Sequence, residues 1–456
     1  MTTGSNPTTG ITQEIVARAL SISFDQLPET ARDMARLCLL DWLGVAIGGA
    51  ADEVSRTVAD YVEYEGGRPE ATVIGLSTKV PASRAALANG TMSHALDYDD
   101  VNRTMNGHPT APVLPAAFAL AETSRSSGHH FMTAFVAGYE TACRVGALVF
   151  PDHYRRGFHA TATIGSFGAA MASARCLDLD QERAAMAMGI AGTEAAGLKS
   201  MFGTACKPFH AGRAAENGVV AARLAARGFT SRGDVLECRD GFASTHSSVF
   251  NPEAALAEPS AGFHILNNLF KYHASCYRTH ASIEAAAQLR ERHDFRPEDI
   301  AEVTIQIAEE ADRICNIAEP RTGLEVKFSL RATAAIALLG LDTAAIDTYS
   351  DKIAVAPDVV ALRDKVRVDL QPGMVANHSI VDVKLRDRRE LSASCNVGIP
   401  ETNLTLLRQR LESKFRQLVT PVLGSEAMLK LLDLTQRIEM LDDIRELAKL
   451  CAPFGK

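Results

Sequence analysis

The chain has 456 residues, of which 46% are hydrophobic and 22% charged, and its formal net charge is −8. This length exceeds what a single hydrophobic core usually supports, so two domains are expected. The excess of acidic residues and the lack of long basic tracts argue against nucleic acid as the main partner. A local cluster of basic side chains can still form a positive pocket for a small anion in an acidic protein.

The nine cysteines are odd in number and show no C-x-x-C spacing, which is not typical of a disulfide scaffold or a zinc ribbon. The first ten residues are polar and lack the apolar segment of a signal peptide. No uncharged apolar run reaches the length that spans a bilayer. These features predict a cytoplasmic protein with no membrane partner.

Helical periodicity dominates the first 250 residues. Apolar and small residues recur at spacings of three and four, which is the pattern of closely packed helices. Helices are expected at residues 30–49, 82–97, 113–124, 131–150, 161–177, 184–197 and 212–227. One short strand is expected at 70–76, where Ala-Thr-Val-Ile-Gly precedes a turn.

The pattern changes after Pro259, where apolar residues begin to alternate with polar ones. Strands mixed with helices in this region indicate a small α+β domain. The expected strands are 300–308, 366–370 and 379–385, and the expected helices are 282–293 and 328–339.

Residues 404–450 are again helical and amphipathic. The predicted fold is therefore mainly α. A large all-helical domain comprises residues 11–264 and 396–456, and a smaller α+β lid domain is inserted at 265–395.

A first group of ionisable residues is Ser-His-Ala-Leu-Asp-Tyr-Asp-Asp at 93–100, followed by Gly-His-Pro-Thr at 107–110. It contains Asp97 and His108, and its Gly-His-Pro turn comes directly before an expected helix, whose N-terminus favours an anion. Composition alone favours a structural interpretation, in which this segment is an acidic helix end and a surface turn. The chemical interpretation depends on the other segments.

Two further segments place basic side chains at expected helix starts. His159 opens a helix of small residues, where it is either an ordinary polar residue or a general acid or base, since histidine titrates near working pH. Lys207 and Arg213, with His210 between them, flank the next start. A cation gains nothing from the helix dipole there, which makes carboxylate recognition one interpretation and a solvated loop the alternative.

A fourth segment, residues 270–280, holds Lys271, Cys276 and His280 near the predicted domain boundary. Clefts between domains are common ligand sites, so a basic segment at this boundary is a candidate for substrate binding. Cys276 fits a small core residue better than a nucleophile.

Motifs for metals and organic cofactors are missing from the sequence. It has no pair of histidines four apart beside a glutamate, no calcium loop, no P-loop and no G-x-G-x-x-G fingerprint. The sequence therefore predicts acid–base chemistry by side chains alone, with no metal and no cofactor.

Together, the motifs Ser-His-Ala-Leu-Asp-Tyr-Asp-Asp, Gly-His-Pro, Gly-Phe-His and Lys-Pro-Phe-His resemble the MmgE/PrpD family. This family includes 2-methylcitrate dehydratase, cis-aconitate decarboxylase and iminodisuccinate epimerase. The resemblance implies a helical domain with an α+β lid, a homodimer without cofactor, and a small anionic carboxylate as substrate. By motif, five residues fall on the family's active-site positions: Asp97, His108, His159, Lys207 and Lys271.

The reactions of this family share a carbanion-like or enolate-like centre beside a carboxylate, which needs a proton-transfer group and cations. We expect His159 to transfer the proton, with His108 as its counterpart on the opposite side and Asp97 orienting a histidine. Lys207 and Lys271 are expected to hold substrate carboxylates. Secondary substrate-binding roles are expected for Arg213, His280, Cys276 and His210.

Three reactions fit the resemblance: dehydration, decarboxylation and epimerisation. Val101 stands where some members, decarboxylases among them, carry threonine, so the sequence favours a 2-methylcitrate dehydratase-like hydro-lyase. The eleven-residue step from Asp97 to His108 is similar to the epimerase spacing, while a related decarboxylase is one residue shorter. The alternative outside enzymes is a non-catalytic helical scaffold or binding protein.

Overall fold

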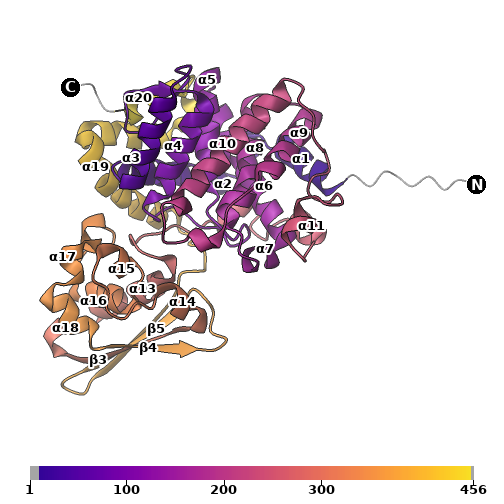
Figure 1. Ribbon diagram of the computed structural model, residues 1–456. Helices are drawn as coiled ribbons and strands as arrows, with labels where there is room; N and C mark the ends of the chain where they lie inside the picture. The colour runs from indigo at the N-terminus through magenta and orange to yellow at the C-terminus, as the bar shows by residue number, and fades with distance from the viewer. Residues whose placement is uncertain (1–9, 453–456) are drawn as a thin grey trace, which may run out of the picture. The chain divides into compact units, whose positions relative to one another are not determined.

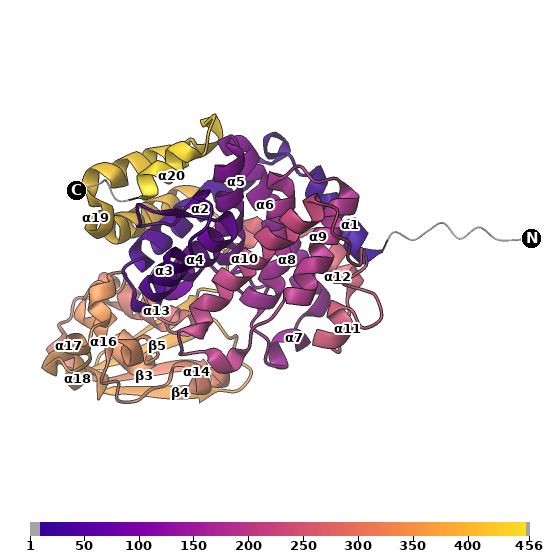
Figure 2. The same ribbon diagram turned by 45° about the horizontal axis from the view of Figure 1, so that its top comes forward.

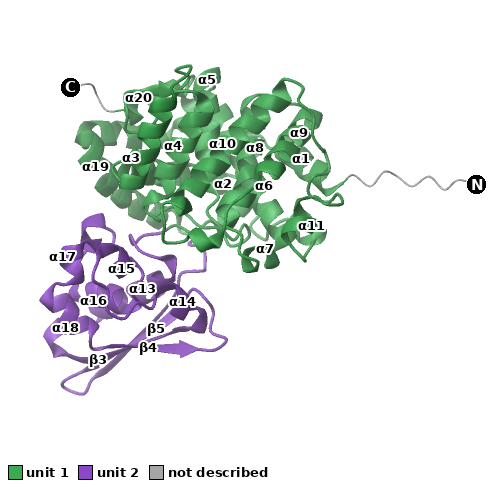
Figure 3. Ribbon diagram, in the orientation of Figure 1, with its two compact units in different colours: residues 1–270, 402–456 green, residues 271–401 purple. Residues whose placement is uncertain are grey.

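The computed structural model describes residues 10–452 and divides into two compact units (Figure 3). The first unit comprises residues 1–270 and 402–456, and the second comprises 271–401. The fold is mainly α with small sheets, which confirms the predicted fold class. The second unit thus begins at residue 271 rather than at the predicted 265, and the chain returns to the first unit at 402 rather than at 396.

The first unit is built almost entirely from helices (Figures 1 and 2). Its longer helices are α1 (Ile11–Ser21), α2 (Glu29–Gly49), α3 (Glu53–Glu65), α4 (Ala82–Ala95), α5 (Thr110–Ser124), α6 (Gly128–Val149), α8 (Ala160–Cys176), α9 (Gln181–Glu194), α10 (Cys206–Ala226) and α19 (Leu404–Gln436). Its shorter ones are α7 (Asp152–Arg155), α11 (Phe242–His246), α12 (Pro252–Leu256) and α20 (Arg445–Cys451). Among the described residues, no single helix meets the length and hydropathy needed to cross a membrane, and α2 and α3 do so only as a pair bent by 86°.

Local sequence explains where this unit departs from the predicted elements. Helix α10 starts at Cys206 rather than 212, because Pro208 lies in its first turn, where a missing backbone N–H breaks no helical bond. Lys207 is therefore in the first turn and Arg213 is inside the helix. The predicted strand at 70–76 is reduced to β1 (Ala71–Thr72), paired antiparallel with β2 (Lys79–Val80). The long C-terminal helix is interrupted at Gly424, whose φ is 79°.

Glycines let the central helices of this unit approach each other closely. A Cβ on Gly90 of α4 would lie 2.8 Å from Gly212 Cα in α10, and one on Gly212 would overlap the carbonyl oxygen of Leu87. A Cβ on Gly168 of α8 would likewise lie 2.8 Å from the carbonyl oxygen of Gly138 in α6. Side chains at these positions would push the helices apart. The C-terminal end of α4 therefore lies beside the N-terminal end of α10.

The second unit is an α+β domain around one four-stranded sheet. Its strand order is β4 (Val366–Gln371), β3 (Ile300–Ala308), β5 (His378–Leu385) and β6 (Glu390–Asn396). Strand β3 runs parallel to β4 and antiparallel to β5. Its helices are α13 (Tyr277–Arg292), α14 (Asp312–Cys315), α15 (Gly323–Lys327), α16 (Leu330–Leu339), α17 (Asp351–Ala354) and α18 (Pro357–Arg363). Strand β6 was not predicted, although its sequence Glu-Leu-Ser-Ala-Ser-Cys-Asn alternates, because it is a short edge strand whose alternating residues are mostly small.

Substituting Gly212 by alanine tests the importance of the close crossing of α4 and α10. The added methyl group overlaps the backbone of α4, so we expect Gly212→Ala to lower the free energy of unfolding by about 1–3 kcal/mol. Urea denaturation of the full chain measures this change. Val220→Ala, on the exposed face of the same helix, is the matched control and should change stability by less than about 0.5 kcal/mol. Equal stability of the two variants would contradict the tight crossing.

Candidate active site

Five of the basic side chains in the first unit gather where helices begin or end. His94 lies in the last turn of α4, and His159 is the N-cap of α8. Lys207 and His210 lie near the start of α10, and His108 lies in the turn that precedes α5. The close crossing of α4 and α10 thus brings together residues that are more than one hundred positions apart in the chain.

The buried carboxylate of Asp99 lies between two of these histidines. Nδ1 of His94 is 2.9 Å from Oδ1 and 2.9 Å from Oδ2 of Asp99, and Nδ1 of His108 is 3.1 Å from Oδ2. Burial raises the pKa of Asp99, but the facing His94 and His108 outweigh it and hold that pKa well below its usual range. The site therefore contains a fixed negative charge that contacts two imidazoles.

His94, His159 and His210 form a row of neutral imidazoles. The ring of His94 lies 4.6 Å from that of His108 and 5.9 Å from that of His159. Nδ1 of His159 is 3.1 Å from Nδ1 of His210, so one ring donates a hydrogen bond and the other accepts it.

Burial is the main reason that these imidazoles are neutral. It lowers the pKa of His94 to about 4, and burial together with the charges of His94 and Lys207 lowers the pKa of His159 well below 6.5. Burial and Lys207 also lower the pKa of His210. These three side chains are neutral at pH 7 and can accept a proton.

Lys207 is the cation closest to this row, and it pairs with Asp97. Its Nζ lies 2.8 Å from Oδ1 of Asp97, with the Lys207 side chain 16% exposed and that of Asp97 25% exposed. Asp97 has a left-handed backbone with φ 51°, which turns the chain directly after α4. The sequence analysis expected Asp97 to orient a histidine; in the structure Asp99 makes that contact, and Asp97 contacts Lys207 instead.

Behind Asp99, a second buried layer supports the 97–100 turn. Nζ of Lys414, in α19, donates to Oδ1 of Asp41 at 2.6 Å and to the carbonyl oxygen of Tyr98 at 2.7 Å. The hydroxyl of Thr110 donates to Asp100, and burial raises the pKa of Asp100 to about 8, so this carboxyl is largely protonated at neutral pH. This layer fixes the backbone from which Asp99 projects.

The donor atoms at the site could also hold a divalent cation. His94, Asp97, Asp99 and His108 each present one ligand atom, and these atoms lie within 4.8 Å of one another. Imidazole and carboxylate are common zinc ligands. Asp99 already contacts both imidazoles, so a metal would displace the proton that His94 shares with this carboxylate.

Four other residues that the sequence analysis singled out, Arg213, Lys271, Cys276 and His280, are not part of this group of side chains in the first unit. Arg213 pairs with Glu216, which also binds Arg84 at 2.9 Å, so its guanidinium belongs to a partly exposed ion-pair network. Lys271, Cys276 and His280 belong to the second unit. Burial lowers the pKa of His280 well below 6.5, and the charges of His273 and Lys271 lower it further. The substrate-binding roles of these residues stay predictions.

Sequence reasoning did not single out His94, Asp99 or Lys414. The signal for the first two was present, because both belong to the Ser-His-Ala-Leu-Asp-Tyr-Asp-Asp motif. Lys414 gave no local signal, since it lies in an ordinary amphipathic helix 373 residues from its partner Asp41.

The buried neutral histidines predict an acid-sensitive fold. Their pKa lies below 6.5 in the folded chain, at about 4 for His94, so the unfolded chain binds more protons between those values. We expect the free energy of unfolding to fall as the pH is lowered from 7 to about 4.5. Urea unfolding of a His94→Gln variant should show a weaker pH dependence, whereas His130→Gln, on the surface of α6, should leave it unchanged. Identical pH dependence in wild type and His94→Gln would be the contrary result.

Comparisons with known proteins give one consistent family. The family model described as the MmgE/PrpD N-terminal domain matches residues 13–255, and the MmgE/PrpD C-terminal domain matches residues 273–439. The chain is 25% identical to cis-aconitate decarboxylase of Mus musculus over 463 residues, covering 96% of this chain and 93% of that protein. It is 26% identical to cis-aconitate decarboxylase of Aspergillus terreus over 482 residues, covering 98% of this chain and 96% of that protein.

Proposed function

The chain belongs to the MmgE/PrpD family, and we propose that it is a lyase that transfers a proton at a carbon beside a carboxylate of a small di- or tricarboxylate. The observation that carries this proposal is the group formed by neutral His159, the Asp99–His108 pair and Lys207. It supplies a proton acceptor, a proton donor and a carboxylate-binding cation within one unit.

Each side chain has a role that follows from its surroundings. Lys207 exchanges Asp97 for a substrate carboxylate and stabilises the negative charge that develops beside it. His159 is neutral, so it is suited to accept a proton. His108 lies with its Nδ1 3.1 Å from the Asp99 carboxylate, which orients its ring, and we assign it the role of proton donor. Lys271 is the second carboxylate ligand that the sequence predicts.

Among the reactions open to such a site, we propose decarboxylation of cis-aconitate or a close analogue first. Full-length similarity to cis-aconitate decarboxylases of an animal and a fungus favours it over the dehydration that Val101 suggested. In this reaction the bond from carbon to the departing carboxylate breaks, and its electron pair remains on the substrate. His108 then delivers a proton to that carbon as CO2 leaves. Dehydration of 2-methylcitrate is the second candidate.

NMR spectroscopy in D2O distinguishes these reactions. The wild-type chain is incubated separately with cis-aconitate, 2-methylcitrate, citrate and iminodisuccinate, and the products are followed over time. We expect loss of CO2 from cis-aconitate, with one deuterium retained in the product. Alkene formation from a hydroxy acid would identify a dehydratase, and deuterium exchange without net change would identify an epimerase.

The same experiment after EDTA treatment should give the same rate, since the proposed steps use side chains alone. No reaction with any of the four would contradict the proposal.

Three single variants test the proposed residues. We expect His159→Gln to lower turnover by about 10²–10⁴-fold, because it removes an imidazole that we assign to proton transfer at the reacting carbon. Lys207→Met and Lys271→Met should lower kcat/KM by about 10²–10³-fold, because each removes a charge beside the developing anion. Steady-state kinetics measure these effects, and circular dichroism checks that the variants fold.

The matched control is Arg227→Met, which removes a cation at the opposite end of α10 and should leave kinetics unchanged. Near-normal turnover in His159→Gln or Lys207→Met would overturn the role of that residue. Near-normal turnover in Lys271→Met alone would restrict the carboxylate contacts to the first unit.

A further inference from the structure

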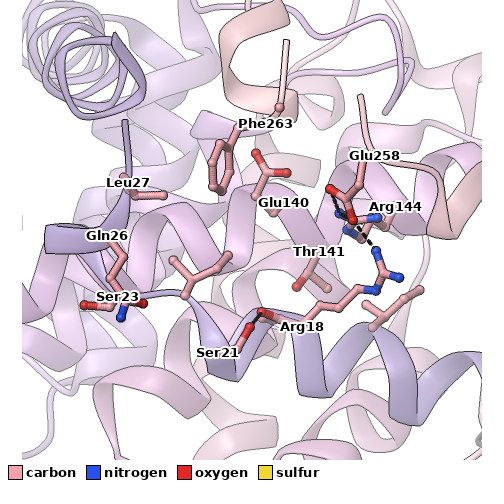
Figure 4. A pocket seen from close by; sticks show the side chains of 14 residues that line it. Arg18, Ser21, Ser23, Gln26, Leu27, Glu140, Thr141, Arg144, Glu258 and Phe263 are labelled. Atoms are coloured by element: carbon pink, nitrogen blue, oxygen red, sulfur yellow. Dashed lines mark hydrogen bonds and ion pairs between the residues drawn. The ribbon is translucent and has the colours of Figure 1, made fainter. Parts of the chain in front are cut away.

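A second polar cavity lies in the first unit between α1, α6 and the segment from Glu258 to Phe263. Its volume is about 330 Å³, enough for a small organic acid. Figure 4 shows Arg18 and Arg144 converging on Glu258 at one end, while Ser23 and Gln26 lie at the opposite end. The cavity is separate from the residues of the candidate active site, none of which lines it.

The two guanidinium groups of this cavity already bind a carboxylate. Arg144 has an 8% exposed side chain, and its Nη2 lies 3.2 Å from Oε2 of Glu258. Arg18 contacts the same carboxylate through Nη1. Glu258 itself comes from the segment after α12, and its side chain is 64% exposed. The two arginines are thus arranged to bind a carboxylate. The carboxylate that they bind here, that of Glu258, is exposed and can be displaced.

Other bonds hold the guanidinium groups in place whether or not Glu258 is bound. Nη1 of Arg144 donates to the carbonyl oxygens of Ala255 at 3.0 Å and Ala257 at 3.2 Å. Nε of Arg18 donates to Glu14 at 2.8 Å, and its Nη1 donates to the carbonyl oxygen of Leu256 at 3.0 Å. A carboxylate that replaced Glu258 would therefore find its binding groups already oriented, which favours affinity.

We propose that this cavity is a second binding site for a small polycarboxylate anion, one carboxylate of which takes the place of Glu258 on Arg18 and Arg144. Planar guanidinium groups favour carboxylates because both present matched pairs of atoms. The hydroxyl of Ser23 and the amide of Gln26, at the far end, can donate to a second carboxylate of the same molecule.

A chain of hydrogen bonds links one wall of the cavity to the backbone of the candidate active site. Glu140 lines the cavity, and its carboxylate accepts the backbone N–H groups of His264 at 3.1 Å and Ile265 at 3.0 Å. The same segment continues to Leu269, which exchanges two backbone hydrogen bonds of 2.8 Å with Val101, two residues after Asp99. Burial raises the pKa of Glu140 to about 7, so this carboxyl can take a proton and donate to a bound anion. As part of the same proposal, such a contact stabilises residues 264–269, which support the 97–101 turn, and thereby regulates the candidate active site.

Binding of tricarballylate, a saturated tricarboxylate, tests this site. Isothermal titration calorimetry is carried out on the full chain carrying Lys207→Met, which weakens binding at the candidate active site and makes the result independent of any turnover. We expect one equivalent to bind. Adding Glu258→Gln removes the internal competitor and should tighten binding by about two- to fivefold. Adding Arg18→Gln, which leaves buried Arg144 in place, should weaken it by about tenfold or more.

Glu253→Gln, with the same change of charge on neighbouring α12, is the matched control and should leave the affinity unchanged. Hydrogen exchange should slow at residues 264–269 when tricarballylate binds. Three results would each overturn the proposal: no binding, binding that is equal in all of these variants, or binding that leaves exchange at 264–269 unchanged.

Discussion

The contact of the α4 and α10 backbones at Gly90 and Gly212 is the constraint on which the candidate site depends. Helices with ordinary side chains between them lie 8–10 Å apart, and a pair in backbone contact lies closer. At this crossing each helix has about one turn left before its polar end. Because the two helices are so close at the crossing, the residues at these ends are also brought close together: His94 on one helix and Lys207 on the other. A single methyl group at either glycine would therefore move both His94 and Lys207.

Close packing also determines the electrostatics of the site. His94, Asp99 and His159 are buried and the other ionisable groups of the site are half-buried, and burial disfavours every charge that lacks a partner. The charges that remain are paired: Asp99 with two histidines and Lys207 with Asp97. For His94, burial outweighs the nearby Asp99 carboxylate, and burial likewise lowers the pKa of His159 and His210, so all three imidazoles stay neutral. A polycarboxylate entering this site would bring the negative charge that balances Lys207.

The features that could be predicted from the sequence are those that depend on residues close together in the chain. Most of the longer helices of the first unit were predicted because apolar periodicity is a local property. The ranges of α1 and α3 were not given, and α10 and α19 differ from the predicted helices at Pro208 and Gly424. The motifs located the site but could not separate the aspartates at 97, 99 and 100, whose roles depend on the left-handed backbone at Asp97. The buried contacts of Lys414 that support the 97–100 turn could not be predicted, because Lys414 and Asp41 meet only after the chain has folded.

The Lys414 contact has a consequence for the timing of synthesis. Its ammonium group is a partner of buried Asp41 and of the carbonyl oxygen of Tyr98, and it lies 204 residues after His210, the last histidine of the candidate site. A chain still emerging from the ribosome has completed every histidine of the site but not the lysine behind them. Asp41 then has to remain in water or be buried without a cation. The nascent protein is therefore expected to complete the support of its candidate site only after α19 has been synthesised, and a premature stop codon between His210 and Lys414 would leave the four histidines without this support.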